Sequence, residues 1–277
     1  MCFVSAIVAL AAAGLGAKAR AGAQARAGWT LTWSDEFGGA DGTSPDPTKW
    51  TYDIGGDGWG NQELEMYTGA PSNSEIRGGN LVITARKESI TDAKGVAHKY
   101  TSARLKTQGI FAQQYGRFET RIKIPKGEGM WPAFWLLGAN IDKVGWPHCG
   151  EVDIMENIGK EPLLVHGSLH SASTVKTTRD FTAPFAAFPD APGFSDDFHV
   201  YAVEWDANNV KFFADSGEYG SVTKEVWVKG NGEWPFDQPF FIILNLAVGG
   251  NWPGPPDKST KFPQQMLVDY VRVYKKS

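Results

Sequence analysis

The chain has 277 residues, a formal net charge of −4 and hydrophobic residues at 42% of its positions. A chain of this length can bury a substantial core, and its acidic balance argues against nucleic acid or another polyanion as its partner. The 11 tryptophans exceed what core packing usually requires. We therefore expect some of them at a ligand-binding surface, because indole rings pack on the apolar faces of ligands.

Residues 1–28 combine an apolar run with small residues and scattered basic ones. The segment resembles a secretory signal peptide with cleavage options after Ala19 or Ala27, although the basic region that normally precedes the apolar run is missing. A misplaced start or a disordered tail is the alternative. No membrane span is expected, because the uninterrupted apolar run is shorter than roughly 20 residues. We expect a secreted or periplasmic protein whose net charge, without residues 1–28, moves from −4 to −7.

Cysteine usage excludes an internal disulfide in such a mature protein. Removal of residues 1–28 takes Cys2 away and leaves Cys149 alone. Cys149 precedes a cluster of acidic residues but has no basic partner in its own stretch. A buried structural thiol is therefore favoured over a nucleophile.

Beyond residue 28, short alternating or apolar segments are separated by Gly, Pro, Asn and Asp, with no long helical period. An Asn-rich turn within residues 205–212 predicts a hairpin. No repeat or linker divides residues 29–277, which predicts one all-β domain, a sandwich of two antiparallel sheets. The clearest predicted strands are residues 80–87, 116–125, 198–206, 210–215, 239–248 and 266–275.

The stretch "WPHCGEVDIMENIG" (residues 146–159) places three carboxylates among apolar residues. In a regular strand Glu151 and Asp153 share one face, whereas Glu156 would lie on the buried face. One extra residue at Ile154 or Met155, a β-bulge, would return Glu156 to the face of the other two acids. The bulge would also shorten the distance between the two glutamates, which a flat strand would hold too far apart.

Acids on one face of a sheet repel one another, so stability alone would not favour them. Glycoside hydrolysis needs two carboxyl groups with separated pKa values, one ionised as nucleophile and one protonated to release the leaving sugar. Asp153 could share a proton with its neighbours and hold the two glutamates in opposite states. The alternatives are a metal site, which has only nearby histidines as further ligands, and a solvated acidic edge, which the intervening apolar residues disfavour.

The motif E-x-D-x-x-E resembles the active-site signature of glycoside hydrolase family 16, in particular its laminarinase (endo-1,3-β-glucanase) branch. Other segments are similar in the same order, including "WGNQELEMYTG", "GRFETRIKIPKGEGMWPAFWLLG", "ILNLAVGGNWPG" and "MLVDYVRVY". The resemblance implies a concanavalin A-like β-jelly-roll with a concave cleft, which cleaves internal β-1,3-glucosidic bonds with retention. Met155, missing from the shorter motif of many mixed-linkage enzymes, favours laminarin, with β-1,3-1,4-glucan as a secondary substrate.

The resemblance also implies roles for particular residues. The nucleophile, the acid/base and the assisting carboxylate would be Glu151, Glu156 and Asp153, respectively. Sugar-binding positions would be Trp131, Trp135, His170, Asn61, Glu63 and Arg86. No cofactor is expected for catalysis, but a structural Ca²⁺ would be held by oxygen atoms at Glu36, Gly79 and Asp269, a donor type that suits a hard cation.

Some of these assignments have alternatives. Trp131 and Trp135 share a face if they lie in one strand, but core packing would also explain them. His170 could be a structural histidine, and Trp252 could line the cleft or pack a turn.

Two other functions on the same fold remain open. A β-1,3-glucan-binding protein would lack a catalytic glutamate, whereas both are present here. A transglycosylase would use the same covalent intermediate but pass it to a sugar. Sulfated agar-type or carrageenan-type substrates are disfavoured by the acidic chain. The expected partner is β-glucan, without nucleic acid or membrane, and the expected state is a monomer.

Overall fold

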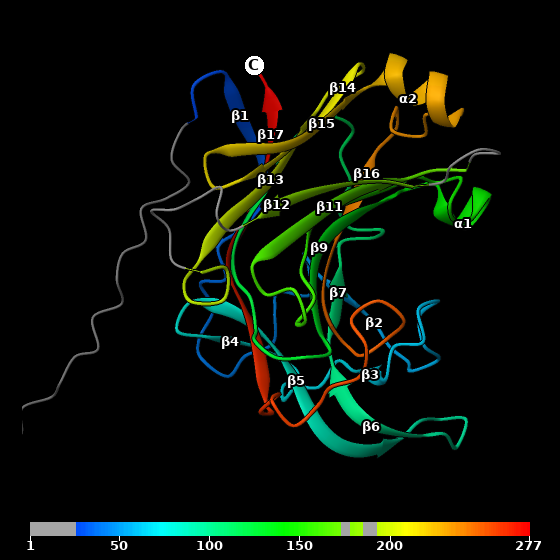
Figure 1. The fold of residues 1–277 in the computed structure, drawn as a ribbon. Helices are drawn as coiled ribbons and strands as arrows, with labels where there is room; N and C mark the ends of the chain where they lie inside the picture. The colour runs from blue at the N-terminus through cyan, green and yellow to red at the C-terminus, as the bar shows by residue number, and fades with distance from the viewer. Residues whose placement is uncertain (1–25, 173–177, 185–192) are drawn as a thin grey trace, which may run out of the picture.

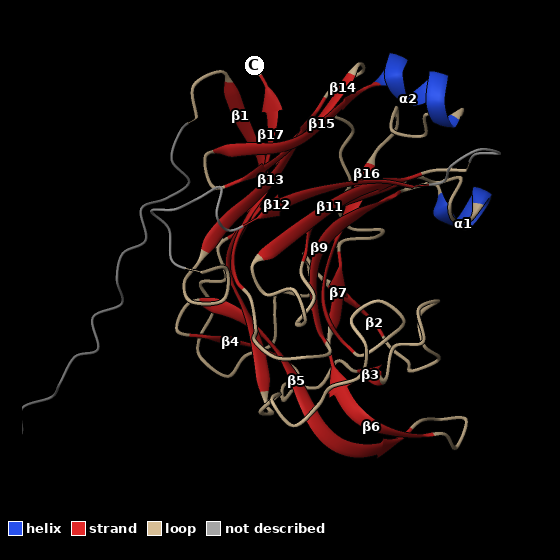
Figure 2. Ribbon diagram, viewed as in Figure 1, coloured by secondary structure: helices blue, strands red, loops and turns tan. Residues whose placement is uncertain are grey.

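The structure, a computed structural model, describes residues 26–172, 178–184 and 193–277. Two β-sheets pack face to face, and the two helices of this described part are short and lie at one end (Figures 1 and 2). The predicted all-β sandwich is confirmed. Neither of these helices has the length and hydropathy needed to traverse a bilayer. Most of the predicted signal peptide (residues 1–28) lies outside the described residues.

The larger sheet has ten strands and the smaller sheet has seven. In the larger sheet the order is β15 (Gly217–Thr223), β14 (Asn209–Ala214), β13 (His199–Trp205), β8 (Gly116–Lys123), β17 (Gln264–Lys276), β5 (Asn80–Thr91), β6 (Ala97–Ser102) and β3 (Glu65–Tyr67), with β1 (Trp29–Asp35) on β17 and β4 (Ser74–Arg77) on β5. In the smaller sheet it is β12 (Thr178–Pro184), β11 (Leu164–His170), β10 (Glu151–Glu156), β9 (Met130–Gly138), β16 (Phe240–Val248), β7 (Arg104–Lys106) and β2 (Thr51–Asp53). The helices are α1 (Ile141–Val144) and α2 (Lys224–Asn231).

All six predicted strands correspond to strands of the structure. The predicted hairpin joins β13 to β14, with Trp205 opposite Val210. The pairing is antiparallel as predicted, except that β3 runs parallel to β6. The predicted fold class, a β-sandwich, is therefore correct, but the described strands include one parallel pair.

The core lies between the sheets and follows the alternation of side chains along each strand. In β9, Phe134 and Leu136 are fully buried in the core, whereas Trp131 and Trp135 are partly exposed on the opposite face. Every residue of β16 is buried. Burial of such large apolar side chains contributes about 1.5–3 kcal/mol each relative to exposure. This core fixes which residues of the smaller sheet face outward.

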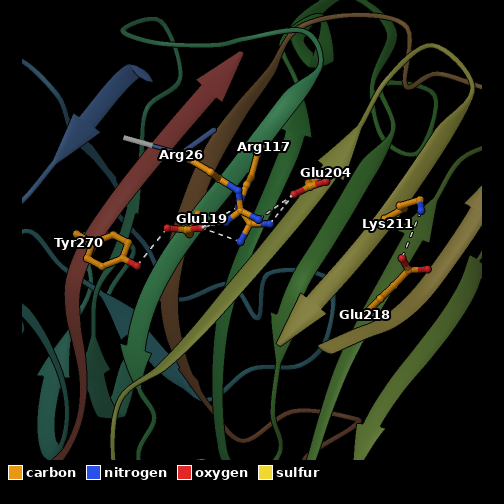
Figure 3. A network of polar contacts seen from close by, with 7 residues as sticks. All are labelled: Arg26, Arg117, Glu119, Glu204, Lys211, Glu218 and Tyr270. Atoms are coloured by element: carbon orange, nitrogen blue, oxygen red, sulfur yellow. Dashed lines mark hydrogen bonds and ion pairs between the residues drawn. The ribbon is translucent and has the colours of Figure 1, made fainter. Parts of the chain in front are cut away.

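A polar network covers the outer face of the larger sheet (Figure 3). Arg117, only 2% exposed, pairs with Glu119 at 2.7 Å and with Glu204 at 2.8 Å. The Tyr270 hydroxyl donates to Glu119 at 3.1 Å, so the network joins β8, β13 and β17. Arg26 approaches the same two glutamates at 3.7 and 3.5 Å. Cleavage after Ala19 would keep the Arg26 contacts, whereas cleavage after Ala27 would remove them.

Candidate active site

The β-bulge predicted in β10 is present. On the β9 side, Asp153 lies opposite Trp135 and Met155 lies opposite Phe134, so Ile154 has no partner in that ladder. Ile154 and Met155 are both fully buried, as two consecutive residues of a bulge can be. The bulge thereby turns Glu156 to the face of Glu151 and Asp153, and all three acids line one cleft.

The cleft lies over the outer face of the smaller sheet and has a volume of about 880 Å³. All three predicted acids and five of the six predicted sugar-binding residues line it; these five are Trp131, Trp135, His170, Asn61 and Glu63. Core packing is therefore not the main role of either tryptophan. Trp252, left open by the sequence, also lines the cleft, where its ring meets the edge of Trp131 at 5.4 Å between centroids.

Asp153 is buried and held in place by polar contacts within the acidic cluster. It is 4% exposed, accepts a hydrogen bond of 2.6 Å from the Ser168 hydroxyl and lies 2.9 Å from His170 Nε2. The same His170 nitrogen lies 3.6 Å from a Glu151 oxygen. The histidine thus belongs to the centre of the site, where it bridges two of the acids.

Each glutamate has its own indole donor. Glu151 accepts a hydrogen bond of 2.9 Å from Trp146 Nε1, and Glu156 accepts one of 2.9 Å from Trp131 Nε1. These bonds hold the two carboxyl groups in defined orientations. Because each indole is also exposed to the cleft, the same residues can contact a bound ligand.

Burial and like charge shift the titration of this cluster. Burial, followed by the charge of Asp153, raises the pKa of Glu151 to about 8 and raises the pKa of Glu156 well above its ordinary value. Burial lowers the pKa of His170, but its hydrogen bond to Asp153 and the surrounding carboxylates raise that pKa to about 10. His170 is therefore a cation at neutral pH.

The cation distinguishes the two glutamates. At Glu151 the strongest opposing contribution to the raised pKa is the charge of His170, whereas at Glu156 it is the neutral indole of Trp131. A nearby cation favours an ionised carboxylate more than a neutral donor does. A single proton on the pair is thus best placed on Glu156, so Glu151, with a pKa of about 8, is the first of the two to ionise as the pH rises. Such a pair can perform acid-assisted displacement at a sugar acetal.

The raised pKa of Glu151 has a consequence for stability. The folded protein holds this proton more tightly than the unfolded chain, so the contribution is fully present below about pH 4.5 and is lost as the pH rises through about 8. Above pH 8 the ionised carboxyl costs on the order of a few kcal/mol. Glu151→Gln is therefore expected to raise the thermal midpoint by several degrees at pH 9 but not at pH 4, as measured by calorimetry.

Glu225→Gln, at an exposed position of α2, is the control and should leave the thermal midpoint unchanged at both pH 4 and pH 9. An equal gain for Glu151→Gln at pH 4 and pH 9 would contradict the assigned shift, because both states hold the proton at the lower pH.

A hydrogen-bonded chain supports the predicted sugar-binding residues. Trp135 Nε1 donates to Asn245 at 2.7 Å, and Asn245 donates to the Tyr67 hydroxyl at 3.0 Å. Tyr67 in turn donates to Glu63 at 3.1 Å, and Asn61 donates to the other Glu63 oxygen at 3.2 Å. Glu63 therefore presents a carboxyl group to the cleft from a fixed position.

Arg86 is the predicted sugar-binding residue that the structure does not place in the cleft lining. It pairs with Glu88 at 3.2 Å on an exposed part of β5, and its contact with sugar stays a prediction. The cleft arginine is Arg104 of β7, whose guanidinium lies 4.8 and 4.7 Å from the ring centroids of Trp59 and Trp135. Arg104 reaches the cleft because β7 pairs with β16, a segment distant in sequence.

Other cleft residues escaped the sequence analysis. Trp59 lies in a glycine-rich segment that could have suggested a loop near a ligand, and Trp146 stands five residues before Glu151. Ser168 carried no signal beyond its place in "HGSLH". Cys149, by contrast, is buried and unpaired as expected, and burial raises the pKa of its thiol to about 11.

The predicted calcium residues converge on one place. Along one edge β17 pairs with β8, and along the other it pairs with β5 through residues 264–268 and with β1 through residues 271–276. Asp269 lies in the gap between β5 and β1, where Glu36 follows β1 and Gly79 precedes β5. Backbone carbonyls and a carboxylate at this junction are oxygen donors of the kind that Ca²⁺ takes.

Side-chain pairing narrows which atoms could serve. Arg272 donates to both Glu36 carboxylate oxygens at 2.9 and 2.8 Å, and Arg121 donates to one Asp269 carboxylate oxygen at 3.1 Å. The oxygen atoms of these three residues are of the donor type that a structural Ca²⁺ takes. Within the described ranges, the three-residue side-chain cluster with metal-binding spacing is Glu151, Asp153 and His170, with ligand atoms within 4.8 Å.

A two-sheet sandwich whose cleft holds two glutamates around a buried aspartate defines the molecule as a glycoside hydrolase. Residues 29–276 match the family described as "Beta-porphyranase A-D, GH16 domain". The chain belongs to glycoside hydrolase family 16, and the β-jelly-roll expected from the resemblance is confirmed.

Similar proteins extend this assignment. The chain is 43% identical over 254 residues to a beta-glucanase of Rhodothermus marinus, covering 89% of this chain and 85% of that one. Its fold is similar to the laminarinase catalytic domain of Thermotoga maritima (TM-score 0.83, 44% identity, 90% of this chain and 99% of that one). It is also similar to the endo-β-1,3-glucanase of Pyrococcus furiosus (TM-score 0.82, 47% identity, 90% and 95%).

Proposed function

We propose that the protein is an endo-acting, retaining β-glucanase that hydrolyses internal β-1,3-glucosidic bonds in laminarin-type glucans, with mixed-linkage β-1,3-1,4-glucan as a secondary substrate. The observation that carries the proposal is the bulge in β10, which directs Glu151, Asp153 and Glu156 into one tryptophan-lined cleft. The similarity to laminarinases and endo-1,3-β-glucanases supports this substrate class. A purely binding role would not need both glutamates and their separate donors.

In the proposed mechanism, ionised Glu151 attacks the anomeric carbon while Glu156 gives its proton to the departing glycosidic oxygen. A covalent glycosyl-enzyme forms, and the leaving chain departs as an alcohol. Glu156, now ionised, takes a proton from water, which attacks the same carbon and releases Glu151. Two inversions give net retention. Asp153, fixed by Ser168 and His170, keeps its carboxyl group beside the two glutamates.

The cleft walls suit a neutral polysaccharide. Trp131, Trp135 and Trp252 offer ring surfaces to sugar faces, while Asn61 and Glu63 offer hydrogen-bonding groups to hydroxyls. Arg104 pairs with Asp53 at 2.9 Å, a carboxylate that it shares with Lys106 at 2.6 Å. The cleft lining holds more acidic residues than arginines, which supports an uncharged glucan over a sulfated chain as the substrate.

Release of reducing sugar from laminarin, barley mixed-linkage glucan and carboxymethylcellulose tests the proposal. We expect the highest rate with laminarin, a lower rate with barley glucan and none with carboxymethylcellulose, with oligosaccharides of several lengths appearing early as endo action requires. Products longer than the starting chains at high acceptor concentration would instead identify a transglycosylase. Retention of laminarin without any cleavage would identify a binding protein.

We propose a structural Ca²⁺ at the junction of β1, β5 and β17, with no cofactor in catalysis. A ligand that binds only the folded state at about 100 times its Kd stabilises it by about 2.7 kcal/mol. Adding Ca²⁺ to chelator-treated protein is therefore expected to raise the thermal midpoint, and Asp269→Ala should abolish the increase. Asp257→Ala, in an exposed loop, is the control that should keep it. An unchanged midpoint in the unsubstituted protein would contradict the site.

The signal-like residues 1–28 support export, and we propose that the mature protein acts outside the cytoplasm as a monomer. Mass determination of the protein from the culture medium or periplasm would show whether the leader is removed and at which alanine. A full-length chain retained in the cytoplasm would overturn the proposal.

A further inference from the structure

The bulge in β10 is held from the opposite side of the sandwich. The Tyr219 hydroxyl donates a hydrogen bond of 2.6 Å to the carbonyl oxygen of Ile154, the residue that β9 leaves without a partner. Tyr219 belongs to β15 of the larger sheet, whereas Ile154 belongs to β10 of the smaller sheet. The bond therefore joins the two sheets and ends at the residue that creates the bulge.

Tyr219 occupies an irregular position of its own. Phe212 of β14 lies opposite Gly220 and Phe213 lies opposite Glu218, so the ladder skips Tyr219. Its ring packs against the core, 5.9 Å from the Phe212 ring between centroids. Two irregular strand positions, one in each sheet, thus face one another through a single hydrogen bond.

Gly167 of β11 leaves room for this hydroxyl. A Cβ atom at Gly167 would lie 2.5 Å from the Tyr219 oxygen and 3.1 Å from the Asp153 carbonyl oxygen. Gly167 stands between His166, which is opposite Glu156, and Ser168, which is opposite Asp153. The glycine therefore lies directly beside the bulge and permits the tyrosine to reach it.

The Tyr219 hydroxyl supplies a hydrogen-bond donor to the backbone carbonyl of Ile154. A bulge leaves ladder groups unpaired, and a buried carbonyl without a donor costs about 1–3 kcal/mol. Burial, followed by the charges of Glu156 and Asp153, raises the pKa of the Tyr219 hydroxyl. The hydroxyl thus remains protonated over the working pH range and can only donate to the carbonyl.

We propose that Tyr219 is a positioning residue for catalysis: through the Ile154 carbonyl it fixes the bulge conformation that aims Glu156 at the glycosidic oxygen. Tyr219 is not among the residues that line the cleft, so it would act through Ile154 and not on the substrate itself. The inference rests on the proposed function, because it takes Glu156 as the acid/base. A loosened bulge would leave binding to Trp131 and Asn61 intact while misplacing the proton donor.

Tyr219→Phe removes the hydroxyl and keeps the ring. We expect kcat on laminarin to fall about tenfold to a hundredfold with KM nearly unchanged, because a misplacement of about 1 Å can cost a hundredfold. With dinitrophenyl β-laminaribioside and azide, the loss should nearly disappear. That leaving group needs no proton and azide needs no base, so neither step uses Glu156.

Tyr201→Phe is the matched control. Tyr201 of β13 is also fully buried, but its hydroxyl has no hydrogen-bond partner among the described residues, so this variant should keep wild-type kcat on laminarin. Gly167→Ala is a second variant, which displaces the Tyr219 hydroxyl from another strand and should show the same substrate-dependent loss. Combined with Tyr219→Phe, it should add little further loss, because both act on one contact.

The outcomes separate the two proposals. An unchanged kcat for Tyr219→Phe, or an equal loss on laminarin and on the azide-assisted substrate, would overturn the positioning role. If Tyr219→Phe does not fold, Gly167→Ala provides the test. An equal loss of its kcat on laminarin and on the azide-assisted substrate would overturn the positioning role. Absence of laminarin cleavage by the wild-type enzyme would instead overturn the proposed function.

Discussion

Glu151→Ala is expected to lower kcat on laminarin by on the order of 10⁴-fold or more, because no other group can form the covalent intermediate. KM should change little, since the tryptophan-lined walls remain. Azide can enter the space left by the side chain and attack an activated dinitrophenyl glycoside directly. One inversion then gives an α-glycosyl azide, which NMR of the product identifies.

Glu225→Ala, on the exposed side of α2, is the control for Glu151→Ala and should retain wild-type kcat. Substantial laminarin cleavage by Glu151→Ala, or a β-glycosyl azide from it, would contradict the nucleophile assignment. The second result would place the nucleophile at another carboxylate of the cluster.

Glu156→Ala is expected to lower kcat on laminarin by about 10²–10⁴-fold, the usual contribution of general acid–base catalysis. The loss should depend on the leaving group: a sugar alcohol needs the proton, whereas dinitrophenolate does not. On the dinitrophenyl glycoside the covalent intermediate should form rapidly and accumulate. Azide should then release it as a β-glycosyl azide, because attack on the intermediate is a second inversion.

A burst of dinitrophenol in rapid-mixing experiments would report the accumulated intermediate of Glu156→Ala. If activity fell equally for good and poor leaving groups, Glu156 would not be the proton donor. The opposite azide stereochemistry of the two glutamate variants is the sharpest contrast, since it assigns both roles with one substrate.

The acidic cluster illustrates how much of the site could be predicted from the sequence. Strand side chains alternate with a period of two, so the five-residue spacing between Glu151 and Glu156 required a bulge if both were to face one cleft. The register of β10 with β9 confirms it. The shared face of Trp131 and Trp135 followed from the same alternation, whereas their place in the cleft was expected from the family resemblance; in the structure Phe134 between them lies in the core.

The residues missed by the sequence analysis reach the site through pairing between distant segments. Arg104 lies on β7, which is only three residues long and too short to give an alternating pattern. The role of Tyr219 depends on contact across the sandwich between strands more than sixty residues apart in sequence. Neither the position of Arg104 nor the contact of Tyr219 produces a periodic pattern in the nearby sequence. The parallel pairing of β3 with β6 was missed for the same reason.

The carboxyl groups of Glu151 and Glu156 are expected to cleave β-1,3-glucan in two steps with retention. Proton NMR of laminarin during the first minutes of digestion by the wild-type enzyme measures this stereochemistry. We predict that new reducing ends appear as the β-anomer and that the α-anomer grows only later by mutarotation. Initial appearance of the α-anomer, or no new reducing ends, would contradict the claim.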